Sequence, residues 1–278
     1  MFMNNTHAII IQGGLGNQLF QIFTLMNYCI ENNCIYIFPK NMQFWDKCRH
    51  PYWNSFLCEL DENTKPNNFI ESLKKYNEPN FHYNEIPLFE KHTTIEGYFQ
   101  SELYFKKHFE KICNILRIRE KQKLVKEKYN QTENSISLHF RMGDFVNPDH
   151  HPIMSDSYYI NSINYLISKT NTTKWTIYYA CEKEDDRVVL ERISNINNNF
   201  KELTFIKIAN ELEDWEQMLF MSCCQHNIIA NSSFSWWSAY LNNNQNKNVC
   251  YPSIWFGPAK KNIQLKDLHP EEWIKIQV

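Results

Sequence analysis

The chain has 278 residues, with 29 Lys and Arg against 31 Asp and Glu and a net charge of −2. This balance argues against a general nucleic-acid binder, because such proteins need a basic surface that releases counterions. Hydrophobic residues make up 43% of the chain, enough for a large core and too many for a disordered protein. Only 6 residues are glycine, where average usage would give roughly twenty. We therefore expect the few glycines to lie where the backbone adopts a special conformation.

Targeting signals and disulfide patterns are absent from the printed sequence. No run approaches the roughly 18 uncharged apolar residues of a membrane span, and residues 1–7 are polar without a basic flank. The 9 cysteines form no CxxC pair, and several lie in apolar runs, which is typical of reduced, buried thiols. We therefore expect a cytoplasmic protein without a membrane-spanning segment.

The first half begins with a predicted strand over 8–12, a glycine turn, and a helix whose apolar residues follow three-four spacing from Leu19. A second short strand is predicted over 35–38 and ends at Pro39. Residues 40–92 look irregular, with four prolines and an amphipathic piece near 69–76. Residues 102–127 predict one long or two short helices.

From residue 135 onward, strands and helices alternate regularly. The predicted strands are 136–140, 176–181, 204–208, 227–230 and 248–251. The predicted helices are 158–168, 185–196, 214–224 and 235–241. This alternation indicates a parallel sheet covered on both faces, with ligands bound at the carboxyl ends of its strands. We expect two α/β domains, 1–125 and 126–278.

The glycine turn over 12–20 contains half of all the glycines. Gly14 and Gly16 would let the backbone approach a ligand, and the helix start offers N–H groups to an oxygen-rich partner. Neither the P-loop nor the dinucleotide fingerprint matches. The structural alternatives are a tight turn that needs left-handed residues or a plain helix cap from Asn17 and Gln18.

A second motif lies at the end of the strand over 136–140. Alternation places His139 and Arg141 on one side of it, where an imidazole and a guanidinium fork suit a phosphate or carboxylate. Asp144 follows within reach. The structural alternative is an Arg141–Asp144 ion pair in a turn.

A third motif follows the short strand over 227–230. Its hydroxyls, amide and N–H groups could cradle an anion at a helix start, or could simply cap a buried helix. The candidate residues are Asn231, Ser232, Ser233, Phe234 and Ser235. We interpret Trp236 and Trp237 as core residues.

Four acids, Glu182 and 184–186, follow the strand over 176–181. They could bind a divalent ion, but they fit better as acids in the first turn of a helix. Glu182 could accept hydrogen bonds from guanine. The absence of a Walker lysine and of an Asp-x-Asp pair favours a metal-free pyrophosphate site for a nucleotide-activated substrate.

These motifs resemble those of the α-1,2-fucosyltransferase family: GGLGNQ at 13–18, HFRMGD at 139–144 and NSSFSWW at 231–237. The segment GYFQS at 97–101 also resembles one common in that family. The resemblance implies a GT-B fold of two Rossmann-like halves with mostly parallel sheets and an active site in the cleft between them. It implies metal-independent, inverting transfer of fucose from GDP-β-L-fucose to a galactose 2-hydroxyl, with no cofactor.

Site roles follow from the same resemblance. Arg141 would hold the β-phosphate with residues 232–235, His139 and Glu182 would lie near guanine, and Asn17 would reach the fucose and the leaving group. Asp144 is the nearest candidate base, although a clamp to Arg141 would lower its pKa. A galactose-terminated glycan is the expected acceptor. Transfer from another GDP-sugar, or a non-catalytic sugar- or nucleotide-binding module, are the alternatives.

Overall fold

The structure is a computed structural model that describes residues 5–41, 50–142 and 149–278. It divides into two compact units. The first unit contains Met1–Glu120 and Ile263–Pro270, and the second contains Lys121–Asn262 and Glu271–Val278. The domain boundary expected after residue 125 stays a prediction.

The first unit is built on a parallel sheet of order β3-β2-β1-β5-β4. Its strands are β1 (Thr6–Ile9), β2 (Ile35–Pro39), β3 (Thr64–Lys65), β4 (Lys74–Asn77) and β5 (Thr93–Glu96). Its helices are α1 (Leu15–Glu31), α2 (Asn67–Glu71) and α3 (Phe109–Ile115), with short 3-10 turns η1 (Cys58–Asn63), η2 (Glu102–Tyr104) and η3 (Lys106–His108).

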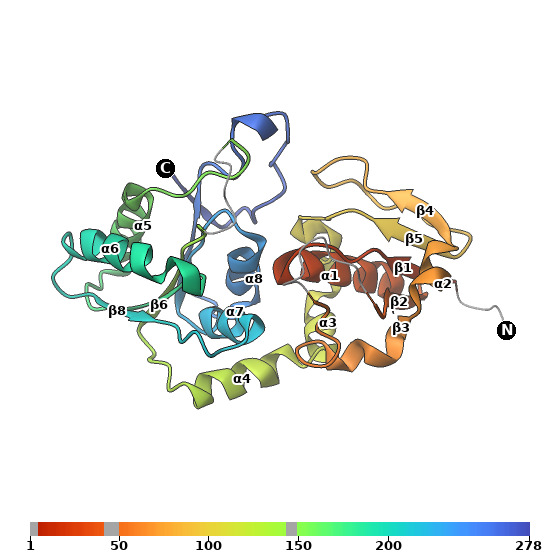
Figure 1. The fold of residues 1–278 in the computed structure, drawn as a ribbon, viewed down its shortest axis with the longest axis horizontal. Helices are drawn as coiled ribbons and strands as arrows, with labels where there is room; N and C mark the ends of the chain where they lie inside the picture. The colour runs from red at the N-terminus through yellow and green to blue at the C-terminus, as the bar shows by residue number, and fades with distance from the viewer. Residues whose placement is uncertain (1–4, 42–49, 143–148) are drawn as a thin grey trace. The chain divides into compact units, whose positions relative to one another are not determined.

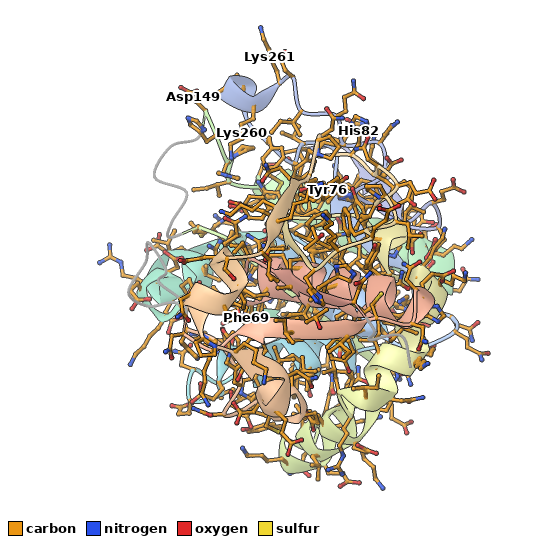
Figure 2. The ribbon with its side chains drawn as sticks, turned by 90° about the vertical axis from the view of Figure 1, so that its right-hand side faces the viewer. Phe69, Tyr76, His82, Asp149, Lys260 and Lys261 are labelled. Atoms are coloured by element: carbon orange, nitrogen blue, oxygen red, sulfur yellow. The ribbon has the colours of Figure 1, made fainter. Side chains whose placement is uncertain are left out.

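The expectation of an irregular segment over 40–92 is wrong where that segment is described, because β3, α2 and β4 lie within it. The amphipathic piece expected near 69–76 overlaps α2 and β4. The β3 strand has only two residues. The β4 strand is at the edge of the sheet and is mostly exposed, and Tyr76 is its one half-buried side chain (Figure 2). An exposed edge strand needs no alternating apolar pattern, so periodicity could not reveal it.

The helix α4 (Ile118–Lys128) follows α3, and the boundary between the units falls inside it. Arg117 separates the two helices and has a left-handed φ of 52°. Residues 102–127 therefore hold two separate α-helices, one of the two predicted outcomes.

The second unit is built on a parallel sheet of order β11-β10-β9-β6-β7-β8. Its strands are β6 (Ser135–His139), β7 (Thr176–Ala180), β8 (Thr204–Lys207), β9 (His226–Ile228), β10 (Val249–Pro252) and β11 (Ile274–Ile276). Its helices are α5 (Asp156–Thr170), α6 (Asp186–Asn197), α7 (Asp214–Ser222) and α8 (Ser233–Leu241), with 3-10 turns η4 (Lys183–Asp185) and η5 (Pro258–Lys260).

Alternation along β6 divides this unit into two layers of core. Ile136 and Leu138 pack against α5 and α6, whereas Ser137 faces the other way and its hydroxyl accepts a hydrogen bond from Asn227, which also donates to the carbonyl of Met221 in α7. Figure 1 shows α5 and α6 on one face of the sheet and α7 and α8 on the other. The expected two-sided parallel sheet is confirmed.

In the described part of the chain, no helix combines the length and apolar character that crossing a membrane requires. Trp236 and Trp237 are fully buried, which confirms their interpretation as core residues.

A half-buried acid in the first unit fixes the chain after β5. The carboxylate of Glu78 accepts hydrogen bonds from the backbone N–H groups of Tyr98 (2.7 Å) and Phe99 (3.0 Å). Gly97 permits this close approach, because a Cβ there would lie 2.4 Å from the Cβ of Glu78. Burial raises the pKa of Glu78 to about 7, against the lowering effect of the two backbone hydrogen bonds.

We predict that Glu78→Gln removes a pH dependence of unfolding. The folded protein binds a proton at Glu78 up to about pH 7, whereas the ordinary value is 4.5. The wild type should therefore lose about 1–3 kcal/mol of unfolding free energy, relative to the variant, as pH rises from 4.5 to 8. Urea unfolding at pH 5 and pH 8 measures this difference. Glu96→Gln, an acid paired at the surface with Lys75, is the control, and an equal gap between wild type and Glu78→Gln at both pH values contradicts the prediction.

Candidate functional site

The second predicted motif lies at the carboxyl end of β6, in the middle of the second sheet. His139 is the last residue of β6 and is 6% exposed. Burial, and after it the charge of Arg141, lower the pKa of His139 to about 3, so its imidazole is neutral near pH 7. The positive charge at this strand end therefore comes from Arg141.

Arg141 is paired with the acid that follows the neighbouring strand. Its Nη1 donates to Oε1 of Glu182 at 3.1 Å, and Glu182 lies two residues beyond the end of β7. The Arg141 side chain is only 14% exposed, whereas that of Glu182 is 58% exposed. An exposed carboxylate can leave a guanidinium at little cost, so Glu182 can give way to an anionic ligand at Arg141.

The third predicted motif begins α8, immediately after β9. Ser232 is the N-cap residue, but its side chain makes no capping hydrogen bond. Ser235 donates its hydroxyl to the carbonyls of Ala230 and Ser232, so this hydroxyl serves the fold. The backbone N–H groups at the start of α8 have no side-chain cap among the described residues, and a helix start in this condition favours an anion.

These two motifs are in contact. The ring of His139 packs on that of Phe234 in the first turn of α8, with ring centroids 5.4 Å apart. The strands β9, β6 and β7 are adjacent in the sheet, so the sequence motifs that follow them share one edge. The structure thus brings together His139, Arg141, Glu182 and the start of α8.

Asn231 ties two loops to this edge. Its Nδ2 donates to the carbonyls of Pro152 (3.0 Å) and Trp255 (3.1 Å). Backbone hydrogen bonds also join these loops, from Ala259 to Asp149 and from Gly257 to His150, and Figure 2 shows Asp149 beside Lys260. In the described structure the amide nitrogen of Asn231 therefore serves the loops.

Two buried polar atoms at this edge lack a partner among the described residues: Nδ1 of His139 and Oδ1 of Asn231. A buried polar atom without a hydrogen bond costs about 1–3 kcal/mol, and such atoms are uncommon in folded proteins. A bound ligand or water would satisfy them. Their presence at the carboxyl edge of a parallel sheet, where α/β proteins bind ligands, supports a ligand site here.

The glycine turn lies in the first unit, after β1. Gly13 has a φ of +79°, Gly14 is the N-cap of α1, and Gly16 is already inside that helix. Two glutamines brace the turn: Gln21 accepts from the backbone N–H of Gln12 (2.9 Å), and Gln18 donates to the carbonyl of Gly13 (3.2 Å). The tight-turn requirement is thus met at Gly13.

Asn17 does not cap α1, because the N-cap position belongs to Gly14 and carries no side-chain hydrogen bond. Its Oδ1 instead accepts a hydrogen bond from Nε2 of Gln100 at 2.8 Å. Gly13 leaves room for this arrangement, since a Cβ there would lie 2.5 Å from Nδ2 of Asn17. The capping alternative is therefore wrong for Asn17.

Some predictions on the site stay open. Gly143 and Asp144 lie outside the described residues, so the Arg141–Asp144 pair and the role of Asp144 stay predictions. The glycine turn belongs to one unit and the other motifs to the second, so their convergence on one diphosphate stays a prediction too.

Among the acids after β7, Asp186 acts within the fold. Asp186 begins α6 and bonds to Lys207 and Asn210, and the hydrogen bond from Lys207 is the main cause that lowers the pKa of Asp186. Within residues 5–41, 50–142 and 149–278, no three His, Cys, Asp or Glu side chains group as metal ligands would.

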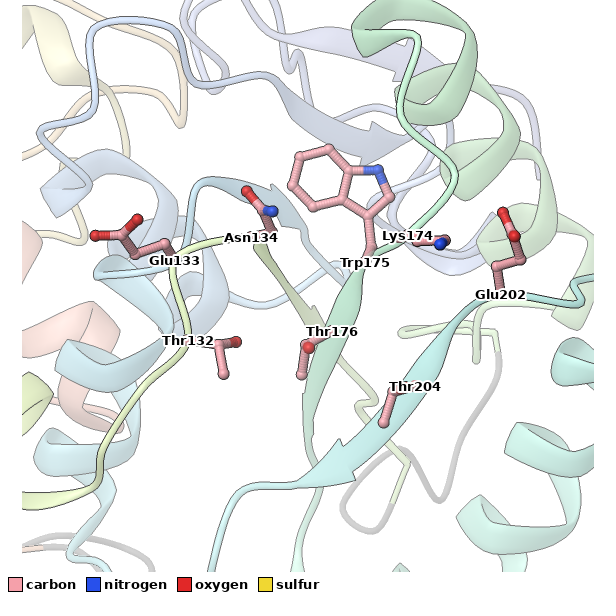
Figure 3. A pocket seen from close by; sticks show the side chains of 8 residues that line it. All are labelled: Thr132, Glu133, Asn134, Lys174, Trp175, Thr176, Glu202 and Thr204. Atoms are coloured by element: carbon pink, nitrogen blue, oxygen red, sulfur yellow. The ribbon is translucent and has the colours of Figure 1, made fainter.

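A cavity of about 570 Å³ lies at the opposite edge of the second sheet, where β6, β7 and β8 begin. Figure 3 shows Trp175 on its wall, with Thr132 on one side and Glu202 on the other. Ser135 at this edge is four residue steps along β6 from His139, a distance of roughly 13 Å along a strand. The cavity is therefore separate from the candidate site.

Sequence reasoning missed the residues that support the site from behind. Tyr159 donates its hydroxyl to the carbonyl of His139 (3.0 Å) and packs its ring on Phe140. Tyr158, its neighbour in α5, donates to the carbonyl of Ile229 at the end of β9 (2.6 Å). Two adjacent tyrosines in a helix read as ordinary packing residues, so only the fold reveals these bonds.

Comparisons with known proteins agree with this architecture. The model of the family described as glycosyl transferase family 11 matches residues 60–277, a range that begins after the glycine turn. An α-1,2-colitosyltransferase of Escherichia coli is 32% identical over 190 residues, which cover 65% of this chain and 61% of that protein. The O-antigen biosynthesis glycosyltransferase WbnK of E. coli is 29% identical over 178 residues, or 59% of this chain and 50% of that protein. The matches thus span only about half to three fifths of these relatives.

Among solved structures, E. coli ADP-heptose lipopolysaccharide heptosyltransferase II is similar over 98% of this chain and 90% of its own, with a TM-score of 0.51 and 10% identity. At this identity the likeness shows the fold alone. The chain has the α/β architecture of the GT-B glycosyltransferases, with two mostly parallel sheets, as its sequence predicted.

We predict that His139 stays neutral down to about pH 4. The folded protein resists protonation of this imidazole, whereas the ordinary value is 6.5. The wild type should therefore lose about 3 kcal/mol of unfolding free energy, relative to His139→Gln, as pH falls from 7 to 4. Denaturant unfolding across this range measures the loss. His226→Gln is a positive control, because burial lowers the pKa of His226 to about 4, and an NMR titration of the His139 ring between pH 5 and 8 would contradict the prediction.

Proposed function

Because the chain belongs to glycosyl transferase family 11, we propose that it transfers L-fucose from GDP-β-L-fucose to the 2-hydroxyl of a terminal galactoside. The transfer inverts the anomeric configuration and uses no metal. The motifs at 13–18, 139–144 and 231–237, which resemble those of the α-1,2-fucosyltransferases, support the choice of donor and linkage.

One observation carries the proposal: a mostly buried guanidinium and an uncapped helix start occupy the same edge of a parallel sheet. Arg141 follows β6, α8 follows β9, and the contact between His139 and Phe234 joins them. A diphosphate fits this combination, because the Arg fork binds two oxygens and the helix N–H groups bind others. The neutral His139 then serves as a hydrogen-bonding group rather than as a charge.

The chemistry of the proposal follows from charge. Glycosyl transfer passes through an oxocarbenium-like state while the leaving group gains negative charge. Arg141 and the start of α8 stabilise that charge on departing GDP, and preorganised electrostatic stabilisation of this kind is usually the largest contribution to catalysis. Glu182 leaves Arg141 when the diphosphate binds, and its carboxylate then accepts hydrogen bonds from guanine.

The acceptor hydroxyl must lose a proton as it attacks the anomeric carbon. In the proposal Asp144, three residues after Arg141 in the sequence, accepts this proton. Asn17, from the glycine turn, donates to an oxygen of the fucose or of the leaving group.

A second donor deserves a test because one relative is named a colitosyltransferase. Colitose is L-fucose without its 3-hydroxyl group. A site that hydrogen-bonds a hydroxyl can reject the analogue lacking it by about 10⁴–10⁵-fold, so the ratio of rates with GDP-fucose and GDP-colitose shows which sugar the site is built for.

The donor experiment measures GDP release from GDP-fucose, GDP-colitose, GDP-mannose and UDP-galactose, with and without a galactoside panel. The proposal expects release from GDP-fucose, faster with acceptor, and an α-1,2 linkage in the product by mass spectrometry and NMR. EDTA should leave the rate unchanged. If another GDP-sugar is preferred, GDP-fucose is the wrong donor and the preferred sugar takes its place in the proposal. GDP binding without turnover of any donor would favour a binding module.

We predict that Arg141→Ala lowers the rate of transfer at least about 10²-fold, because loss of one such donor typically costs 10²–10³. Thermal unfolding checks that the variant is folded. Arg187→Ala is the matched control: Arg187 is 93% exposed and pairs only loosely with Glu191. Near-normal transfer by folded Arg141→Ala would show that Arg141 does not bind the diphosphate as proposed.

We predict that Asp144→Asn, with saturating donor, loses at least about 10²-fold in turnover, since general-base catalysis contributes about 10²–10⁴. Its binding of GDP, measured by calorimetry, should change little. A variant that keeps most of its turnover would assign the proton to another group.

A further inference from the structure

Gln100 makes a hydrogen bond that joins two segments far apart in the sequence. Its Nε2 donates to Oδ1 of Asn17 at 2.8 Å, across 83 positions. Asn17 lies in α1, which follows β1, and Gln100 follows β5. Because β1 and β5 pair in parallel, the chain leaves both strands at the same edge of the first sheet. Gln100 is 8% exposed, so water competes little for this bond.

The backbone around Gln100 is fixed on its N-terminal side. Phe99 has a left-handed φ of 53° and a fully buried ring that packs edge-on against Tyr104. A bulky residue rarely adopts this conformation, and strain of this kind persists where the surroundings enforce it. Here the carboxylate of Glu78 holds the N–H groups of Tyr98 and Phe99.

Asn17 is fixed from the opposite side by the glycine turn. A Cβ at Gly13 would lie 2.5 Å from Nδ2 and 3.0 Å from Cβ of Asn17, so the amide rests directly against the backbone of Gly13. The side chain of Asn17 is only half-buried. Within residues 5–41, 50–142 and 149–278, no residue accepts a hydrogen bond from Nδ2 of Asn17.

The hydrogen bond from Gln100 orients the side-chain amide of Asn17. An amide has a carbonyl oxygen that accepts and a nitrogen that donates. In this structure Nε2 of Gln100 donates, so Oδ1 of Asn17 faces Gln100 and the N–H groups of Nδ2 are left for another partner. With Gln100 in this orientation, a rotated Asn17 amide would place two donors against each other.

We propose that Gln100 is a positioning residue, which holds the Asn17 amide so that its nitrogen donates to the sugar or to the departing oxygen of the donor. This inference rests on the proposed function, since it takes the ligand of Asn17 from there. Gln100 itself does not touch the substrate. The segment 97–101 thereby gains a role in the reaction, which is to position Asn17.

The experiment replaces Gln100 by Leu, which is close in size and has no donor. We expect kcat for fucose transfer to fall about 10-fold or more, with less than about 3-fold change in the KM for GDP-fucose, because an amide that is free to rotate weakens an interaction used in the transition state. On an Asn17→Ala background the same substitution should cost less than about 2-fold, since the bond is already lost.

Gln131→Leu is the control. Gln131 is also 8% exposed and also donates through Nε2, in its case to the backbone carbonyl of Phe220, but it lies in the second unit, in none of the motifs. It should lose stability without loss of kcat. If Gln100→Leu does not fold, Gln100→Met, which is unbranched and as long, takes its place.

The outcomes separate the two proposals. A wild type that releases no GDP from GDP-fucose overturns the proposed function and this inference with it. An active wild type whose folded Gln100 variant keeps its kcat within about 2-fold overturns the inference alone. Losses that add in the double variant also overturn it, because Gln100 would then act independently of Asn17.

Discussion

All the described strands pair in parallel with their neighbours. Parallel pairing brings the carboxyl ends of neighbouring strands to one edge, whatever the length of chain between them. In the second unit this collects His139, Glu182 and the start of α8, although the sequence separates them by more than 90 residues. In the first unit it brings the glycine turn beside the segment after β5. The side chains at these edges are therefore neighbours because of backbone hydrogen bonding and not because of any attraction of their own.

Charge is unevenly shared at the edge of the second sheet. His139 is buried and neutral, Arg141 is nearly buried and charged, and Glu182 is exposed. This distribution of charge suits an anion site that must also release its ligand. The cation, Arg141, is fixed, and its carboxylate partner is exposed enough to be solvated by water when a ligand displaces it. The hydroxyl of Ser235 and the amide nitrogen of Asn231 are engaged inside the fold. Their contribution is to the shape of the α8 start.

Most of the second unit was predictable from the sequence, because its central strands β6, β7 and β9 are buried on both faces and its helices α5 and α6 are amphipathic over several turns. Both the apolar runs and the spacing between them are legible in such a unit. Less of the first unit was predictable from the sequence, because β3 has two residues and β4 is an exposed edge strand. The motif residues could be identified by type and position at strand ends. Their partners could not, since nothing in the local sequence links Tyr159 to His139, or Gln100 to Asn17, and those bonds exist only after distant strands have paired.

A short segment near the C-terminus returns to the first unit. Residues Ile263–Pro270 pack with it rather than with the unit that precedes and follows them in sequence, and Asp267 accepts a hydrogen bond from the backbone N–H of Tyr83 at 3.1 Å. The polypeptide therefore passes between the units three times, once in α4 and twice near its end. A single cut cannot divide this protein into two self-sufficient pieces: a fragment that stops within α4 lacks the strap that covers Tyr83, and the remaining fragment carries that strap with nothing to receive it.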